Sequence, residues 1–125
     1  MHGSETVLIA EDNDQIRVLG HNFLSRLGYT VLIAEKGREA LEVLEKQEGR
    51  VHLLLADVVM PDMNGKDLFE RASAKYPTLK VLYMSGYSGT VLSQRGVLED
   101  GVQIIQKPFS VRDLATKVRE VLDKE

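Results

Sequence analysis

The sequence has 125 residues, the length of one domain with a single core, and its 43% hydrophobic and 28% charged residues are typical of a soluble globular protein. The net charge of −3 gives no reason to expect nucleic-acid binding, and the absence of cysteine excludes disulfides and thiolate metal sites. No apolar run approaches the ~20 residues of a membrane helix and no signal peptide is recognisable, so we expect a cytoplasmic location.

Five short segments rich in Val, Leu and Ile follow one another along the chain, at residues 6–11, 30–34, 51–56, 80–84 and 102–106. Each has the pattern of a strand that is buried on both faces, as in a parallel sheet. All five lie within residues 6–123, which we interpret as one domain. The preceding "MHGSE" at residues 1–5 is interpreted as a tag or a linker stub.

Between these segments, apolar residues recur at helical spacing within residues 16–27, 40–44, 68–72 and 111–122. Gly28 follows the first stretch as a stop signal, and Ser110 with Asp113 resembles a capping pair that opens the last one. Three glycines interrupt the segment 86–101, where we expect only a short helix. Five alternating strands and helices predict an α/β fold, with helices on both faces of a doubly wound parallel sheet.

Polar residues stand where the predicted strands end. The first strand ends in Glu11 and Asp12, the third in Asp57, the fourth in Ser85 and the fifth in Lys107. In an open parallel sheet these ends lie at one edge, where ligands gather. Like charges ~4 Å apart at an effective dielectric near 20 cost roughly 4 kcal/mol per pair, so the acids must hold a cation or protons.

The residue types at this edge suit phosphoryl chemistry. Oxygen ligands favour Mg²⁺ or Ca²⁺ over zinc, and Mg²⁺ commonly binds carboxylates together with a phosphate. The ammonium of Lys107 and the hydroxyl of Ser85 can each contact a phosphoryl oxygen. A carboxylate can attack phosphorus to form an aspartyl phosphate. The combination predicts a phosphoryl-accepting site centred on Asp57.

Each residue also has a purely structural interpretation. The acidic pair after the first strand could lead into a helix with Asp12, Asn13 or Asp14 as its N-cap. Asp57 alone would be an ordinary turn residue, and Lys107 alone a solvated charge. The joint pattern favours the functional interpretation, because four different strand ends carry the groups that one reaction needs.

Four motifs resemble the receiver domain of two-component response regulators. They are "AEDN" after the first strand, "ADVVMPDMNG" around the third, "MSG" after the fourth and "QKPFS" after the fifth. Together they span about residues 5–122 in the order and spacing of that family. The resemblance implies a three-layer, flavodoxin-like fold with five parallel strands in the order 2-1-3-4-5.

The resemblance also implies roles for the acidic residues. Asp57 would be the phosphoryl acceptor, receiving the group from a phosphohistidine of a partner protein. Glu11, Asp12 and Asp57 would hold Mg²⁺, for which Mn²⁺ could substitute, with Asp12 a more direct ligand than Glu11. The backbone carbonyl of Val59 would supply a further ligand. Such a domain promotes its own phosphorylation and dephosphorylation and is no multi-turnover enzyme.

Further residues would convert phosphorylation into a signal. Ser85 resembles the hydroxyl residue that senses the phosphoryl group, Lys107 resembles its charge partner, and the Lys107–Pro108 peptide bond is expected to be cis. Ile104 stands where the family often has a Tyr or Phe, which predicts a weaker or differently wired output. The apolar Val59 and the bulky Tyr87 flank the acceptor and predict slow autodephosphorylation.

The stretch from residue 81 to residue 110 also resembles receivers at the carboxyl end of hybrid sensor histidine kinases. This favours a domain excised from such a kinase, cytoplasmic even if the kinase is membrane-bound, over a stand-alone regulator. Its partner would be a histidine kinase or a histidine-phosphotransfer protein. We expect docking on the first helix, which carries Ile16, and on the loop after Pro108. The domain itself would be a monomer or weak dimer that contacts neither nucleic acid nor membrane.

Two other protein classes share parts of the pattern. Haloacid-dehalogenase-type phosphatases also use an aspartate nucleophile with Mg²⁺, but they typically carry a second acid two residues later, where this chain has Val59. A flavodoxin-like flavin carrier would need a phosphate-binding Ser, Thr and Gly run after the first strand, where "EDND" would repel phosphate.

Overall fold

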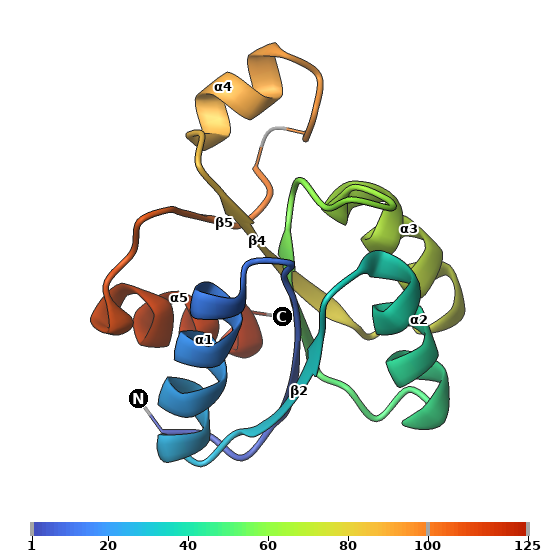
Figure 1. Cartoon of the computed structure of the whole chain (residues 1–125), viewed down its shortest axis with the longest axis vertical. Helices are drawn as coiled ribbons and strands as arrows, with labels where there is room; N and C mark the ends of the chain where they lie inside the picture. Colours follow the sequence, from blue (N-terminus) through green and yellow to red (C-terminus); the bar gives the residue numbers. More distant parts are fainter. Residues whose placement is uncertain (1, 100, 125) are drawn as a thin grey trace.

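The fold, taken from a computed structural model that describes residues 2–99 and 101–124, alternates five strands with five helices (Figure 1). All strand pairs are parallel and the order is β2-β1-β3-β4-β5, as the resemblance implied. The elements are β1 (Thr6–Ala10), α1 (Asp14–Arg26), β2 (Thr30–Ala34), α2 (Gly37–Lys46), β3 (Leu53–Asp57), α3 (Gly65–Lys75), β4 (Lys80–Ser85), α4 (Gly89–Gln94), β5 (Ile104–Gln106) and α5 (Val111–Asp123).

Two apolar layers enclose the sheet, which explains why its central strands are apolar at nearly every position. Val7 and Ile9 of β1 point toward α1 and α5, where they pack with Leu24 and Leu114. The alternate residues of β1 and β3 point to the other face and pack against α2 and α3. Figure 1 shows these two helix pairs on opposite sides of the sheet. Side chains that alternate direction along a strand therefore fill two separate cores.

Main-chain pairing sets the strand ends one or two residues away from the predicted positions. β1 ends at Ala10 and not at Glu11, whereas β3 extends through Asp57, which pairs with Met84. β4 likewise extends through Ser85, which pairs with Gln106. The fifth strand begins at Ile104 and not at residue 102. Asp57 and Ser85 are thus held by the sheet itself, although their side chains are polar.

Local capping bonds begin the helices that flank the predicted site. The side chain of Asn13 accepts a hydrogen bond from the Ile16 amide at 3.1 Å, which makes Asn13 the N-cap of α1. This decides among the three candidate caps and leaves the carboxylate of Asp12 outside that role. Ser110 caps α5 by accepting from the Asp113 amide at 3.0 Å, as the sequence predicted. Gly28 follows α1 with φ of 102°, a conformation that suits a stop glycine.

Helix α4 is short, as the glycine-rich sequence predicted, and it stands out from the layers formed by the other helices (Figure 1). A third, smaller cluster anchors this region, in which Leu92 and Leu98 pack with Val58 and Tyr83. Val58 directly follows the end of β3. The α4 segment therefore contacts the sheet next to Asp57.

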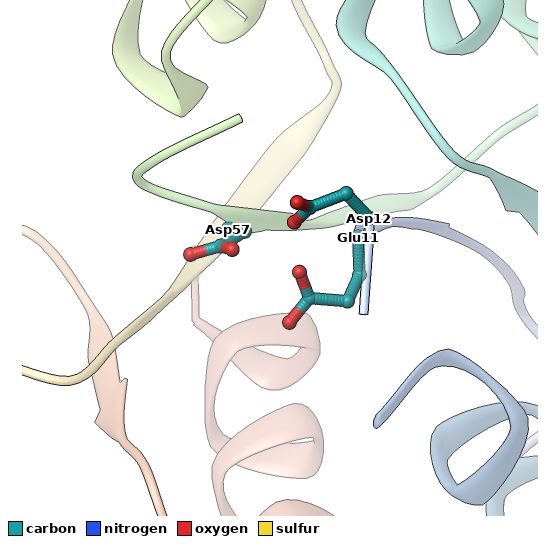
Figure 2. A group of neighbouring side chains, drawn as sticks. All are labelled: Glu11, Asp12 and Asp57. Carbon is teal, nitrogen blue, oxygen red and sulfur yellow. The ribbon is translucent and has the colours of Figure 1, made fainter. Parts of the chain in front are cut away.

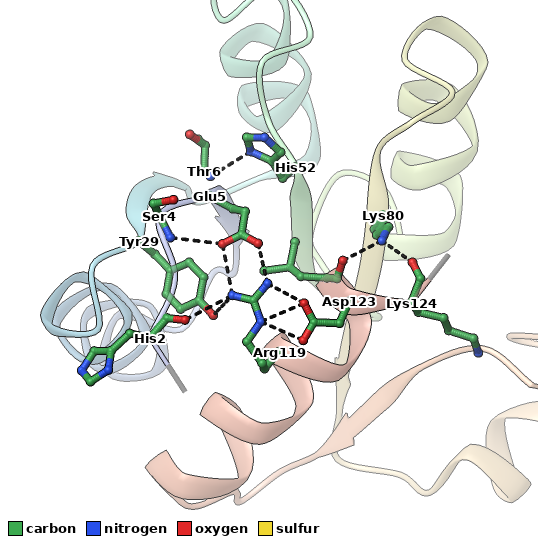
Figure 3. A network of polar contacts seen from close by, with 11 residues as sticks. His2, Ser4, Glu5, Thr6, Tyr29, His52, Lys80, Arg119, Asp123 and Lys124 are labelled. Carbon is green, nitrogen blue, oxygen red and sulfur yellow. Dashed lines mark hydrogen bonds and ion pairs between the residues drawn. The ribbon is translucent and has the colours of Figure 1, made fainter.

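Residues 3–5 pack on the domain. Glu5 pairs with Arg119 of α5, with 3.1 Å between Oε1 and Nη1, and Arg119 also contacts the hydroxyl of Tyr29 and the carboxylate of Asp123 (Figure 3). The amide of Gly3 donates to the carbonyl of Leu27 at 3.1 Å. These contacts join residues before β1 to α5, while the interpretation of residues 1–5 as a tag or linker stays a prediction.

Candidate functional site

The structure brings the polar strand ends together at the carboxyl edge of the sheet. Glu11 follows β1, Asp57 ends β3, Ser85 ends β4 and Lys107 follows β5. Glu11 is fully buried, and Asp57 and Ser85 are 8% and 3% exposed. Buried polar groups need partners, so their neighbours determine what this edge can do.

Three carboxylates form the acidic part of the site. One oxygen from each of Glu11, Asp12 and Asp57 lies within 4.8 Å of the other two. Figure 2 shows the carboxylate groups facing a common space, with Asp12 and Glu11 on one side and Asp57 on the other. Asp12 is exposed, so this space is open to solvent. A set of oxygen donors at such spacing fits a hard divalent cation such as Mg²⁺.

Lys107 supplies a positive charge to the same place. Its Nζ lies 2.5 Å from Oε1 of Glu11 and 3.2 Å from Oδ2 of Asp57. Burial opposes the charged form of Lys107, but the hydrogen bond to Glu11 and the charge of Asp57 outweigh it and raise the pKa of Lys107. Burial and the nearby Asp57 raise the pKa of Glu11, while Lys107 acts in the opposite direction. The ammonium therefore partly compensates carboxylates that repel one another.

Backbone contacts fix the loop that follows Asp57. The Val59 amide lies 3.3 Å from Oδ1 of Asp57, to which it donates, so the two oxygens of Asp57 face different donors. The amide of Gly65 donates to the carbonyl of Val58 at 2.9 Å. A Cβ at Gly65 would lie 2.5 Å from the carbonyl oxygen of Asp57, so only glycine allows this close approach. The start of α3 thus packs directly against the main chain of Asp57.

Ser85 is linked to both neighbouring loops. Its hydroxyl accepts a hydrogen bond from the Tyr87 amide at 2.9 Å, and its carbonyl accepts from the Lys107 amide at 2.7 Å. The Lys107–Pro108 peptide bond is cis, as expected. The end of β4 is therefore hydrogen-bonded to Lys107, the residue that carries the ammonium group of the site.

The flanking positions differ in their surroundings. Val59 is 70% and Tyr87 52% exposed, and the guanidinium of Arg95 lies 5.3 Å from the centre of the Tyr87 ring. Ile104 is half-buried and packs against the cluster that contains Tyr83. An aliphatic side chain therefore occupies position 104, where the sequence predicted a weaker or differently wired output signal.

Two residues make contacts around the site that the sequence did not predict. Asp62 accepts hydrogen bonds at 2.9 Å from the amides of Gly37 and Arg38, and so it caps α2 from the loop that follows Asp57. Arg17 of α1 is buried and donates to the carbonyl of Glu11 at 2.8 Å. The sequence did contain one indication of a partner for Arg17, because Asp14 precedes it by one helical turn, a spacing that favours an ion pair.

The comparisons with known proteins agree with this geometry. The profile of the response regulator receiver domain family matches residues 7–119. The chain is 38% identical over all 125 residues to part of the sensor kinase CckA of Brucella abortus (strain 2308), of which it spans 13%. It is 34% identical to the response regulator receiver protein CpdR of the same strain, and the match covers 93% of this chain and 95% of CpdR.

The fold is also that of a solved receiver domain. The crystal structure of the receiver domain from the hybrid histidine kinase CckA has a TM-score of 0.80 and 34% identity, covering 94% of this chain and 99% of that one. A parallel five-stranded sheet with an acidic pocket at its carboxyl edge is the arrangement that defines receivers. The chain belongs to the response regulator receiver domain family and acts in two-component signalling, in which receivers interact with histidine kinases. Among residues 2–99 and 101–124, no helix is long and apolar enough to cross a bilayer.

Proposed function

We propose that this domain accepts a phosphoryl group on Asp57 from a phosphohistidine of a partner protein. The observation that carries the proposal is the convergence on Asp57 of two further carboxylates and the ammonium of Lys107. Membership of the receiver family supports it over an aspartate-nucleophile phosphatase or a flavin carrier. The domain then acts as a stoichiometric acceptor and is not a multi-turnover enzyme.

The residues divide the chemistry between them. An oxygen of Asp57 attacks phosphorus, the P–N bond to the imidazole breaks, and the imidazole keeps the electron pair and takes a proton from water. Lys107 neutralises charge on the oxygens of the transferring group. Glu11, Asp12, Asp57 and the carbonyl of Val59 would hold Mg²⁺ or Mn²⁺, which supplies further neutralisation of phosphoryl charge when bound.

The phosphorylated state changes what the Ser85 hydroxyl contacts. This hydroxyl accepts from the Tyr87 amide at 2.9 Å, and it can also donate to a phosphoryl oxygen on Asp57. Attraction toward the new charge moves Ser85 and with it the loop that leads into α4. Because α4 is anchored by few side chains, the change shifts the population of α4 positions.

An apolar surface beside the acceptor suits a helical partner. Val18 and Leu19 of α1 are 52% and 44% exposed. A hollow of about 380 Å³ next to them is lined by Ile16, Leu19, Lys107, Pro108 and Phe109. A histidine kinase or a histidine-phosphotransfer protein that covers this surface would bring its phosphohistidine to Asp57. Neither nucleic acid nor membrane takes part, and the domain is a monomer or a weak dimer.

The parent protein is proposed to be a hybrid sensor histidine kinase, with the domain on its cytoplasmic side. The 38% identity to the CckA sensor kinase across the whole chain supports this origin. The 34% identity to CpdR, which the chain matches over 95% of its length, keeps a stand-alone regulator as the second candidate.

The test is incubation with acetyl phosphate or phosphoramidate and Mg²⁺, followed by intact-mass measurement. We expect one added phosphoryl group, which is absent in Asp57→Asn and does not form in EDTA. Asp67→Asn is the matched control, because Asp67 is exposed in the first turn of α3. Labelling that persists in Asp57→Asn would reassign the acceptor, and steady turnover of phosphate esters would favour the phosphatase.

A further inference from the structure

Arg17 is a buried cation that the phosphoryl chemistry itself does not use. It lies in the first turns of α1 and is only 7% exposed, although arginine is rarely buried unless it is paired. Burying an unpaired guanidinium would cost several kcal/mol. The hydrogen-bond partners of the guanidinium therefore indicate the role of Arg17.

The guanidinium joins three segments at the edge of the site. Nη1 donates to the carbonyl oxygen of Glu11 at 2.8 Å. Nη2 donates to Oδ1 of Asp14 and, at 3.2 Å, to Oε1 of Glu35. Glu35 directly follows β2, and Glu11 directly follows β1. The planar fork of arginine reaches these acceptors together, which the single ammonium of lysine cannot do.

Glu11 is consequently held at both its main chain and its side chain. Arg17 binds its carbonyl, while Lys107 Nζ lies 2.5 Å from its carboxylate. The carbonyl of Glu11 belongs to the peptide unit that joins it to Asp12, so the orientation of this carbonyl sets the direction of the chain at Asp12. Both acids of the pocket that follow β1 thus depend on one backbone position.

We propose that Arg17 is a positioning residue that aligns Glu11 and Asp12 for the divalent cation. The inference rests on the proposed function, because it concerns the same cation site. Arg17 is not one of the oxygen donors of the cation site and acts through the main chain of Glu11. Partners that orient metal ligands typically affect metal affinity by 10–100-fold.

A positioning role and a purely electrostatic role for Arg17 predict opposite changes in cation affinity when Arg17 is replaced. Removing the positive charge of Arg17, whose guanidinium binds the Glu11 carbonyl beside the acidic residues, makes the local potential more negative, which by itself would tighten cation binding. Removing a support for the ligands instead weakens binding. Weaker binding in Arg17→Met therefore cannot come from the change in charge.

The experiment measures the binding of Mn²⁺ by electron paramagnetic resonance and of Mg²⁺ by calorimetry, without any phosphodonor. We expect Arg17→Met to bind both ions about 10-fold more weakly than the wild type. Arg17→Lys, which keeps the charge, should also bind more weakly. Arg26→Met is the matched control, because it removes the same charge from an exposed position of the same helix and should leave the affinity unchanged.

A readout in the metal-free protein separates positioning from general destabilisation. Amide hydrogen exchange at Glu11 and Asn13 should accelerate in Arg17→Met, at a temperature where circular dichroism shows the variant folded, and not in Arg26→Met. Unchanged or tighter cation binding in Arg17→Met overturns the inference while leaving the proposed function intact. If Arg17→Met does not fold, wild-type affinity in Arg17→Lys overturns it. A wild-type protein that takes up neither ion would overturn the proposed function and this inference together.

Discussion

Lys107 Nζ lies 2.5 Å from Oε1 of Glu11, although 96 residues separate the two in the chain. The same ammonium is 3.2 Å from Asp57. One cation therefore contacts two of the three carboxylates that are expected to hold a divalent ion. In the proposed function Lys107 would assist phosphoryl transfer, while its positive charge would oppose the binding of a divalent cation at the same site.

Lys107→Met should accordingly have opposite effects on two measurable quantities. The rate of labelling by acetyl phosphate should fall by about 10²–10³, as when one charge-stabilising donor is removed from an active site. Mg²⁺ affinity, measured by calorimetry at low ionic strength, should rise because a competing cation is gone. Lys117→Met on α5 serves as the control. A parallel loss of both quantities would mean that Lys107 mainly supports the fold of the pocket.

Gly65→Ala should destabilise the protein because the added Cβ would lie 2.5 Å from the carbonyl oxygen of Asp57. Forcing an extra carbon into a packed site typically costs about 1–3 kcal/mol. Urea unfolding followed by circular dichroism measures this change. Gly86→Ala is the matched control, since a Cβ there meets no atom within 4 Å. Equal stability of the two variants would show that the loop after β3 shifts to accommodate the added Cβ at little cost in free energy.

Glu5 should contribute a stability that disappears in acid. The hydrogen bond from Arg119 lowers the pKa of Glu5 from 4.5 to about 2. A lowered pKa in the folded state gives stability that is present above pH 4.5 and is lost as the pH falls toward 2. Glu5→Gln should therefore lower the free energy of unfolding at pH 7 by about 1 kcal/mol. Thermal unfolding from pH 7 to pH 3 should show that difference shrinking, whereas Glu45→Gln, exposed on α2, should change little at any pH.

The phosphoryl group on Asp57 should be long-lived in the purified domain. Val59 and Tyr87 follow Asp57 and Ser85 by two residues, and we expect their side chains to restrict the approach of water to the phosphoryl group. Tyr87→Ala should shorten the lifetime several-fold because it removes the bulkier of the two groups, and Thr90→Ala in the same exposed segment should not. Intact mass followed over time after removal of the phosphodonor measures the decay. A wild-type lifetime of only seconds would contradict the prediction.

The sequence predicted the edge of the sheet where the site lies, because strand ends share an edge once all the strands are parallel. Asp57 and Lys107 could be placed together on that ground alone. Their separation could not be predicted, because it depends on the β3–β4 and β4–β5 pairings that connect these strands. The β3–β4 pairing also extends β3 through Asp57, whereas the sequence pattern predicted that the apolar strand runs only to Ala56.

Local sequence also left the start of α1 undecided. Asp12, Asn13 and Asp14 are all good N-cap residues, so their types alone do not distinguish them. In the folded protein Asn13 caps the helix, Asp14 pairs with Arg17, and Asp12 faces the acidic pocket. One short run of polar residues thus divides into three roles according to which tertiary partner lies nearby.

The sequence by itself determined the α/β class, the parallel sheet and the strand ends that carry chemistry, because periodicity and residue type are local properties. Only the tertiary structure decided that Arg17 is buried, since its partners Glu11 and Glu35 come from two different strand ends. It also decided that Asp62 caps α2, whose own N-cap residue, Lys36, makes no side-chain capping bond. Contacts between distant segments have no local signature in the sequence, because Arg17, Glu35 and Asp62 are each of a residue type that is ordinarily found at the protein surface.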